Sequence, residues 1–204
     1  MQCVIMKVHH ENRKIVIKDK VITALDEFVL DFTRILKKYT DYVVVSGYVV
    51  ILFGRARGTE DIDTIIKYMD KSAFLSFYQD LKENRYYFLN PEDADGLYEM
   101  LEEGLGIRAA REDTIIPNVE LKFDKDDFDR YSIENRVTVF IDQSHVCVSP
   151  VELQIPYKLY LRSDKDIEDA VYLWDIFKET ANIPLLKKFM KALHVTGDPY
   201  GIEV

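Results

Sequence analysis

The stretch that decides the fold lies in the first third of the chain. Residues 43–66 read VVVSGYVVILFGRARGTEDIDTII. The short β-branched run at the start of this stretch is typical of a buried strand, and Ser46-Gly47 ends it. Tyr48 to Gly54 fits either a strand or a short helix, because it is rich in Val and Ile but lies between two glycine signals. The sequence thus predicts a strand, a tight turn and a second strand.

The second predicted strand, Asp61 to Ile66, carries two carboxylates. Strand alternation places Asp61 and Asp63 on one face and Ile62 on the other. Two like charges so close raise each other's pKa unless a cation lies between them. Mg²⁺ and Mn²⁺ prefer oxygen ligands, so either ion is a natural counter-charge. The alternative is a solvated strand edge that carries acids by chance.

Together, Ser46-Gly47 and Arg57-x-Thr59-x-Asp61-x-Asp63 resemble the signature of the DNA polymerase β-type nucleotidyltransferase superfamily. In that superfamily a strand ends in a small-residue pair, a short helix follows, and the next strand carries Asp-hydrophobic-Asp. The spacing is most similar to the abortive-infection branch, whose members are toxin or antitoxin components in bacteria and archaea. Ser46 stands where the family usually has a glycine.

A weaker likeness lies further along the chain. Pro150 to Leu153, Lys158, and Lys165 to Asp169 are similar to the family's Lys … Lys-Asp-x-x-Asp helical segment. The resemblance implies an α/β (α+β) nucleotidyltransferase fold, with a mixed sheet flanked by helices and a C-terminal helical segment. Pro150 marks the predicted boundary between an α/β core, residues 1–149, and that helical segment, residues 150–204.

The resemblance also implies a third carboxylate on a later strand. Val119 to Phe123 alternates between apolar and charged residues, which makes Glu120 the first candidate. Asp142 is the competitor, although it falls at a predicted turn. The other interpretation of Glu120 is an exposed strand residue beside Lys122.

By resemblance, the reaction is two-metal transfer of a nucleoside monophosphate from an NTP, with Asp61, Asp63 and Glu120 holding Mg²⁺ or Mn²⁺. The implied nucleotide-binding residues are Ser46, Gly47, Arg57, Thr59 and Lys158. Two of them have a plainer interpretation as salt-bridge partners, Lys158 with Asp166 and Arg57 with a nearby acid.

Two classes of function follow. The first is an enzyme whose acceptor is RNA, a protein or a small molecule. The second is a non-catalytic binding module of the same fold, such as an antitoxin-like partner protein. An active enzyme needs three carboxylates that converge on one point, whereas a binding module tolerates an acid that faces away.

Composition supports an ordinary globular protein in the cytoplasm. The 204 residues include 27 basic and 36 acidic side chains, so the formal charge is 27 − 36 = −9. That charge speaks against a broad, sequence-independent nucleic-acid surface. Cys3 and Cys147 are too few for a disulfide framework. The longest apolar run near the start, Tyr42 to Phe53, is shorter than the ~20 residues of a membrane span.

Hydrophobic spacing gives the remaining elements. We expect helices over residues 21–39, over residues 72–83 with Ser72 as the N-cap, and around residues 96–103. Residues 137–141 and 146–148 flank a short polar turn and indicate a hairpin.

Overall fold

The structure is a computed structural model, and it describes residues 7–11 and 13–204. Within that part of the chain, nine strands form one sheet. They are β1 (Lys7–Glu11), β2 (Lys14–Lys18), β3 (Tyr42–Val44), β4 (Asp61–Ile66), β5 (Tyr86–Phe88), β6 (Ile107–Arg111), β7 (Asn118–Phe123), β8 (Val137–Ile141) and β9 (Ser144–Val148). Their order across the sheet is β1-β2-β8-β9-β3-β4-β7-β6-β5. Pairs β2–β8, β3–β9 and β4–β7 are parallel and the others antiparallel, so the sheet is mixed, as predicted.

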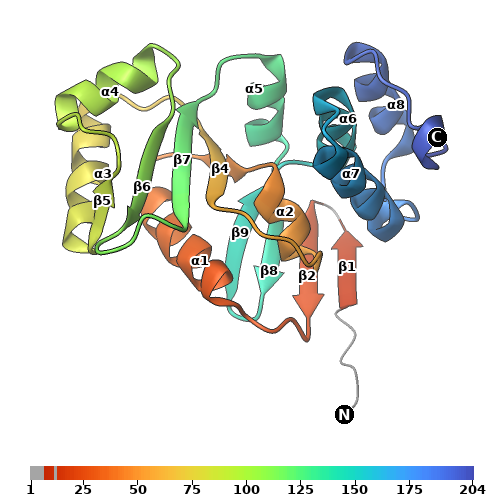
Figure 1. The fold of residues 1–204 in the computed structure, drawn as a ribbon, viewed down its shortest axis with the longest axis horizontal. Coiled ribbons are helices and arrows are strands. Elements are labelled where there is room, and N and C mark those ends of the chain that lie inside the picture. Colours follow the sequence, from red (N-terminus) through yellow and green to blue (C-terminus); the bar gives the residue numbers. More distant parts are fainter. Residues whose placement is uncertain (1–6, 12) are drawn as a thin grey trace.

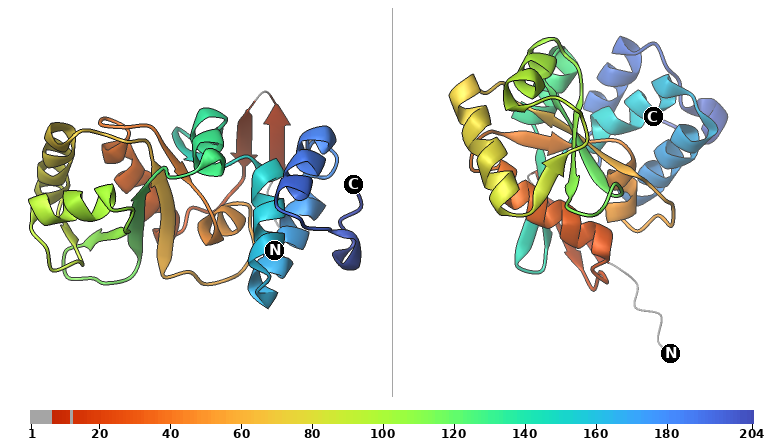
Figure 2. Two further views of the ribbon diagram at one scale, coloured as in Figure 1. Left: turned by 90° about the horizontal axis from the view of Figure 1, so that it is seen from above. Right: turned by 60° about the vertical axis from the view of Figure 1, so that its left-hand side comes forward.

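Helices flank this sheet and extend it at both ends. They are α1 (Ala24–Leu36), α2 (Gly47–Leu52), α3 (Lys71–Glu83), α4 (Ala94–Glu102), α5 (Asp127–Glu134), α6 (Val151–Leu161), α7 (Asp164–Phe177) and α8 (Ile183–Ala192), with a 3₁₀ turn, η1 (Asp198–Tyr200). Figures 1 and 2 show α3 and α4 together at one end of the molecule and α6, α7 and α8 together at the other. The strands with the paired acids therefore lie between two groups of helices.

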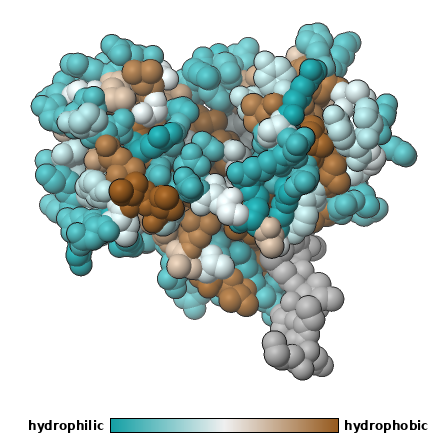
Figure 3. Space-filling model, viewed as in Figure 1, coloured by the Kyte–Doolittle hydropathy of each residue, from teal (hydrophilic) through white to brown (hydrophobic). Residues whose placement is uncertain are grey.

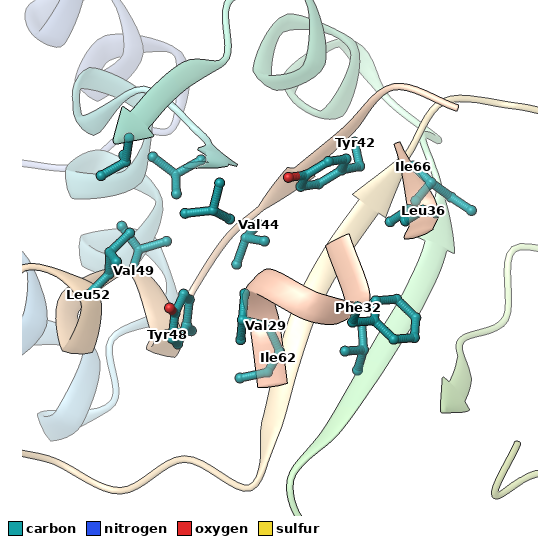
Figure 4. Close-up of a cluster of buried hydrophobic side chains, with 14 of the residues drawn as sticks. Val29, Phe32, Leu36, Tyr42, Val44, Tyr48, Val49, Leu52, Ile62 and Ile66 are labelled. Atoms are coloured by element: carbon teal, nitrogen blue, oxygen red, sulfur yellow. The ribbon is translucent and has the colours of Figure 1, made fainter. Parts of the chain in front are cut away.

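The packing of α1 on the sheet fixes which way β4 faces. Val29, Phe32 and Leu36 recur at helical spacing on α1 and are fully buried. Ile62 and Ile66 of β4 belong to the same cluster (Figure 4). Full burial of one such side chain contributes about 1.5–3 kcal/mol, so this face of β4 is strongly specified. The alternate residues of β4 consequently point to the opposite face.

Hydrophilic side chains cover much of the face shown in Figure 3, with apolar groups in patches between them. No helix in the described residues is long and apolar enough to cross a membrane. Cys3 lies outside the described residues, and Cys147 is a free, partly buried thiol.

The structure settles several points that the sequence leaves open or predicts wrongly. The Tyr48–Gly54 stretch is helical, as α2. The N-cap of α3 is Asp70, whose side chain accepts a hydrogen bond from the Ala73 N–H, so the prediction of Ser72 as the cap is wrong. Strand β6 and helix α5 occupy segments in which the sequence predicts neither.

Candidate active site

The two β4 carboxylates share one face, as predicted. Burial alternates along the strand, with Asp61 and Asp63 half-buried and Ile62 fully buried. Val45, the residue after β3, donates its N–H to the Asp63 carbonyl oxygen at 2.9 Å. The turn at Ser46 is therefore held directly beside Asp63.

Glu120 joins the pair from the neighbouring strand. β4 and β7 are parallel, and their register sets Asp63 opposite Glu120. One carboxylate oxygen from each of Asp61, Asp63 and Glu120 lies within 4.8 Å of the other two. We call these three residues the carboxylate cluster. Asp142 is exposed in the turn between β8 and β9 and does not belong to it.

Ser46 adopts a backbone conformation that favours glycine. Its φ and ψ are 62° and −131°, in a region that residues with a Cβ rarely occupy. This geometry gives a physical reason for the glycine that the resemblance leads us to expect at this position. The turn is formed with serine in place, at a conformational cost.

Gly47 lies beneath two other residues of the predicted site. A Cβ built on Gly47 would come within 3.0 Å of Arg57 Nη2 and 3.3 Å of Thr59 Oγ1. Thr59 Oγ1 in turn donates to the Asp61 carbonyl oxygen at 3.0 Å. Because Gly47 has no side chain, the loop that leads into β4 packs directly against it. The predicted nucleotide-binding residues near the β4 acids are therefore Ser46, Gly47, Arg57 and Thr59.

The electrostatics of Asp63 are unfavourable for a free carboxylate. Burial and the nearby Asp61 charge raise the pKa of Asp63, and Glu120 adds to the effect. A hydrogen bond from the Ser46 side chain and the charge of Lys122 act in the other direction without outweighing the rise. A cation bound next to Asp63 would therefore stabilise its ionised form.

Glu120, in contrast, already has two cationic partners. Arg108 Nε and Nη2 donate to Glu120 Oε2 at 2.9 and 2.5 Å, and Lys122 Nζ forms an ion pair with Oε1. Burial alone would raise the pKa of Glu120, but the hydrogen bonds from Lys122 and Arg108 lower it. Glu120 itself is only 8% exposed.

Asn118 adds an unpaired oxygen to the same face. It precedes Glu120 by two residues on β7 and pairs in register with Asp61. Its amide nitrogen donates to the carbonyl oxygens of Glu60 and Ile115, while Oδ1 is buried and has no hydrogen-bond partner. A buried acceptor without a partner is costly. Carboxylate oxygens are ligands that hard divalent ions prefer, so the three acids of the carboxylate cluster fit Mg²⁺ or Mn²⁺.

A cavity of about 270 Å³ opens beside the carboxylate cluster. Asp63 and Glu120 line it from the sheet, and residues of α5 and α6 line the opposite side. Lysines 122, 125 and 158 also line it, together with a third acid, Asp129, so a bound polyanion would find lysines beside the acids.

Lys158, which lines this cavity, also belongs to a second group of charged side chains. Its side chain is 2% exposed and its Nζ lies 2.7 Å from Asp169 Oδ2 and 3.4 Å from Asp166 Oδ1. Arg55 and Arg57 also form ion pairs with Asp169, which is fully buried. We call Asp169, Arg55, Arg57 and Lys158 the Asp169 cluster. Lys158 and Arg57 are thus salt-bridge partners of acids, as the alternative interpretation of the sequence predicts. The nearer partner of Lys158 is Asp169 rather than Asp166.

The sequence patterns do not single out Arg108 or Asn118. Asn118 could have been found, because alternation from Glu120 puts it on the acidic face. Arg108 belongs to a segment, Ile107-Arg-Ala-Ala-Arg111, that lacks the β-branched pattern of a strand.

Comparisons with known proteins place the fold. No protein-family model matches the sequence, and no curated protein matches it. An antigenic nucleotidyltransferase-like protein from Paracoccidioides brasiliensis superposes with a TM-score of 0.50 at 16% identity, over 82% of this chain and 85% of that one. The antibiotic-resistance factor ANT(2'')-Ia superposes with a TM-score of 0.50 at 12% identity, over 87% of this chain and 91% of that one. The chain therefore has a mixed α/β nucleotidyltransferase fold, which confirms the predicted fold class.

Proposed function

We propose that this chain is a metal-dependent nucleotidyltransferase that transfers a nucleoside monophosphate from an NTP to an acceptor hydroxyl. The observation that carries the proposal is the convergence of Asp61, Asp63 and Glu120 from two adjacent strands of a nucleotidyltransferase fold. The raised pKa of Asp63, caused by burial and by Asp61, supports the proposal, because a bound cation would stabilise the ionised carboxylate.

In this proposal Asp61 and Asp63 hold the divalent ions and Glu120 completes the ligand set. Bound Mg²⁺ or Mn²⁺ would lower the pKa of the acceptor hydroxyl and neutralise charge on the triphosphate. The acceptor oxygen bonds to the α-phosphorus, the bond from that phosphorus to the bridging oxygen breaks, and pyrophosphate leaves with the electron pair. The hydroxyl proton passes to solvent.

We assign the nucleotide to the cavity beside the carboxylate cluster. Lys158 lines that cavity and stays a candidate for offsetting phosphate charge. Ser46, Gly47, Arg57 and Thr59 are candidates because they surround the turn next to Asp63. Since Arg57 packs over Gly47, its contribution would come from charge held near the turn.

The acceptor is RNA, a protein or a small molecule. The Arg57-x-Thr59-x-Asp61-x-Asp63 spacing supports placing the chain in the abortive-infection branch. On that placement the chain is one component of a toxin–antitoxin pair, and its partner is the other component.

A second candidate function is a non-catalytic binding module. One observation favours it: Glu120 is already paired with Arg108 and Lys122, so the third carboxylate is occupied by internal cations. In that case the fold serves contact with a partner protein and no divalent ion binds.

The two candidates are separated by nucleotide transfer in an Asp63→Asn variant. The wild-type protein, given radiolabelled NTP, Mg²⁺ and candidate acceptors, should release pyrophosphate. Asp63→Asn should lose more than about 100-fold of that activity, since loss of even an outer-shell partner of a metal ligand costs ~10–100-fold. Asp142→Asn is the matched control, because Asp142 is an exposed acid outside the carboxylate cluster.

A binding measurement accompanies this assay. NTP and Mg²⁺ together should raise the melting temperature more than either alone, because ligands stabilise the native state that binds them. Unchanged activity in Asp63→Asn would reject the metal role of Asp63, and no melting shift at millimolar NTP and Mg²⁺ would favour the binding module.

A further inference from the structure

The pairing of Glu120 divides the carboxylate cluster into two unequal parts. Asp61 and Asp63 have no ion-pair partner among the described residues, whereas both oxygens of Glu120 are engaged by Arg108 and Lys122. Together these five groups carry −3 from the acids and +2 from the bases, a sum of −1. A divalent ion that enters the cluster therefore has to compete with the two internal cations for Glu120.

The sheet register builds this arrangement. β6 and β7 are antiparallel, and Arg108 pairs with Glu120 across them. Because Asp63 pairs with Glu120 from the other side, the row Asp63, Glu120 and Arg108 runs across three adjacent strands. Lys122 follows Glu120 by two residues on the same face of β7.

Gly106 makes room for the second cation. A Cβ built on Gly106 would lie 2.9 Å from Glu120 Oε1 and 2.9 Å from Lys122 Cε. The Glu120–Lys122 pair thus occupies space that any other residue at position 106 would fill.

Both cations that pair with Glu120 are partly exposed to solvent. The Arg108 and Lys122 side chains are 51% and 46% exposed, whereas the Glu120 side chain is 10% exposed. A half-exposed cation recovers its hydration as it leaves, and the entering ion replaces it beside the buried carboxylate, so the exchange leaves no buried charge unpaired.

We propose that Arg108 and Lys122 are exchangeable counter-cations of Glu120. They hold its carboxylate in the cluster while no divalent ion is bound, and they release it when an ion binds to Asp61, Asp63 and Glu120. They are positioning residues that set the divalent-ion affinity of the nucleotide-free protein. The inference rests on the proposed function, because it takes the carboxylate cluster to be a metal site.

Divalent-ion binding without nucleotide tests this directly. Free Mn²⁺ is measured by electron paramagnetic resonance in titrations of the wild type, Arg108→Met and Lys122→Met. Each substitution should tighten Mn²⁺ binding roughly tenfold, because it removes a cation that competes with the ion for the Glu120 carboxylate. Lys122→Arg keeps the charge and should bind as the wild type does. Lys125→Met removes a cation from the same cavity that is not paired with Glu120, and its effect should be smaller.

A double substitution separates exchange from general electrostatics. In a Glu120→Gln background, Lys122→Met should give little further tightening, because the carboxylate that the lysine occupies is gone. Equal tightening with and without Glu120, or wild-type affinity in Arg108→Met and Lys122→Met, would overturn the exchange while leaving the metal site intact. Absence of Mn²⁺ binding by every protein would overturn both the exchange and the proposed metal-dependent function.

Discussion

The two charge clusters of this molecule are built in opposite ways. In the Asp169 cluster one fully buried carboxylate faces three cations, Arg55, Arg57 and Lys158. In the carboxylate cluster three acids face two cations, and both cations contact the same acid. The first cluster satisfies its buried charge, while the second leaves two acids without an ion-pair partner among the described residues.

This difference suggests two roles, since the Asp169 cluster stabilises the fold and the carboxylate cluster is arranged to bind an ion. The Asp169 cluster joins segments far apart in the sequence, since Arg55 and Arg57 follow α2 while Lys158 and Asp169 lie on α6 and α7. It ties the loop that enters β4 to the C-terminal helices, and Tyr172 of α7 adds a hydrogen bond to the Phe53 carbonyl oxygen. The carboxylate cluster lies on two adjacent strands of the sheet, and its members Asp63 and Glu120 line a cavity. We infer that the Asp169 cluster stabilises the part of the fold that positions the carboxylate cluster.

The largest effect should come from removing the centre of the Asp169 cluster. Asp169→Asn leaves Lys158, Arg55 and Arg57 without their shared carboxylate, and Lys158 is almost fully buried. Breaking a buried ion pair costs about 3–5 kcal/mol, so we expect the free energy of unfolding to fall by that amount in urea titrations. Glu168→Gln is the control, because Glu168 is an exposed partner of Arg55, and such pairs are worth about 0–1 kcal/mol. A loss below about 1 kcal/mol in Asp169→Asn would show that the cluster does not hold the frame.

This comparison was only partly accessible from the sequence. Alternation predicted that Asp61 and Asp63 share a face and that Glu120 lies on a strand, and the structure confirms both. It also ranked Glu120 above Asp142, and the carboxylate cluster contains Glu120. These predictions succeed because a strand period of two is a local property. The chemical roles of Asp61, Asp63 and Glu120 stay predictions, as does the division of the chain at residue 150.

What the sequence missed depends on contacts between distant segments. Arg108, one of the two partners of Glu120, comes from β6, a strand whose central residues are alanines. Helix α5 buries only Ser132 and Ile133, so its apolar periodicity is weak, although Asp126 caps its first turn. Asp169 as a shared partner of two arginines could not be predicted, since more than 100 residues separate it from Arg57. Local patterns do not carry such pairings.

A middle-sized effect should come from the strained turn at the edge of the carboxylate cluster. Ser46 has a positive φ that glycine adopts freely, and a residue with a Cβ in such a region costs on the order of 1–3 kcal/mol. Ser46→Gly should therefore stabilise the protein by about 1 kcal/mol, because the added freedom of the unfolded glycine offsets part of the relief. Urea titration measures the gain. A loss of stability would mean that the hydroxyl contact with Asp63 outweighs the backbone strain.

The smallest effect should be a pH-dependent one from the unpaired acid. Burial and Asp61 raise the pKa of Asp63 above its ordinary value of 3.8, so the folded state binds its proton more tightly than the unfolded state does. The stability that this proton provides is full below the ordinary pKa and is lost as the pH rises through the raised one. Asp63→Asn removes that loss and should stabilise the metal-free protein at neutral pH by about 0.2–1 kcal/mol, the size of a like-charge contact on a sheet face.

Melting temperatures of wild type and Asp63→Asn from pH 3 to pH 7 measure this difference. The gap between them should widen in favour of the variant as the pH rises. Glu120 gives the opposite trend, because hydrogen bonds from Lys122 and Arg108 lower its pKa against the effect of burial. Its contribution is present above the ordinary glutamate pKa and is lost as the pH falls through the lowered one, so Glu120→Gln should be relatively less stable at neutral than at acid pH. If both variants shifted with pH in the same direction, the contrast between a paired and an unpaired carboxylate within one cluster would fail, and with it the argument that Asp63 lacks the ion-pair partners that Glu120 has.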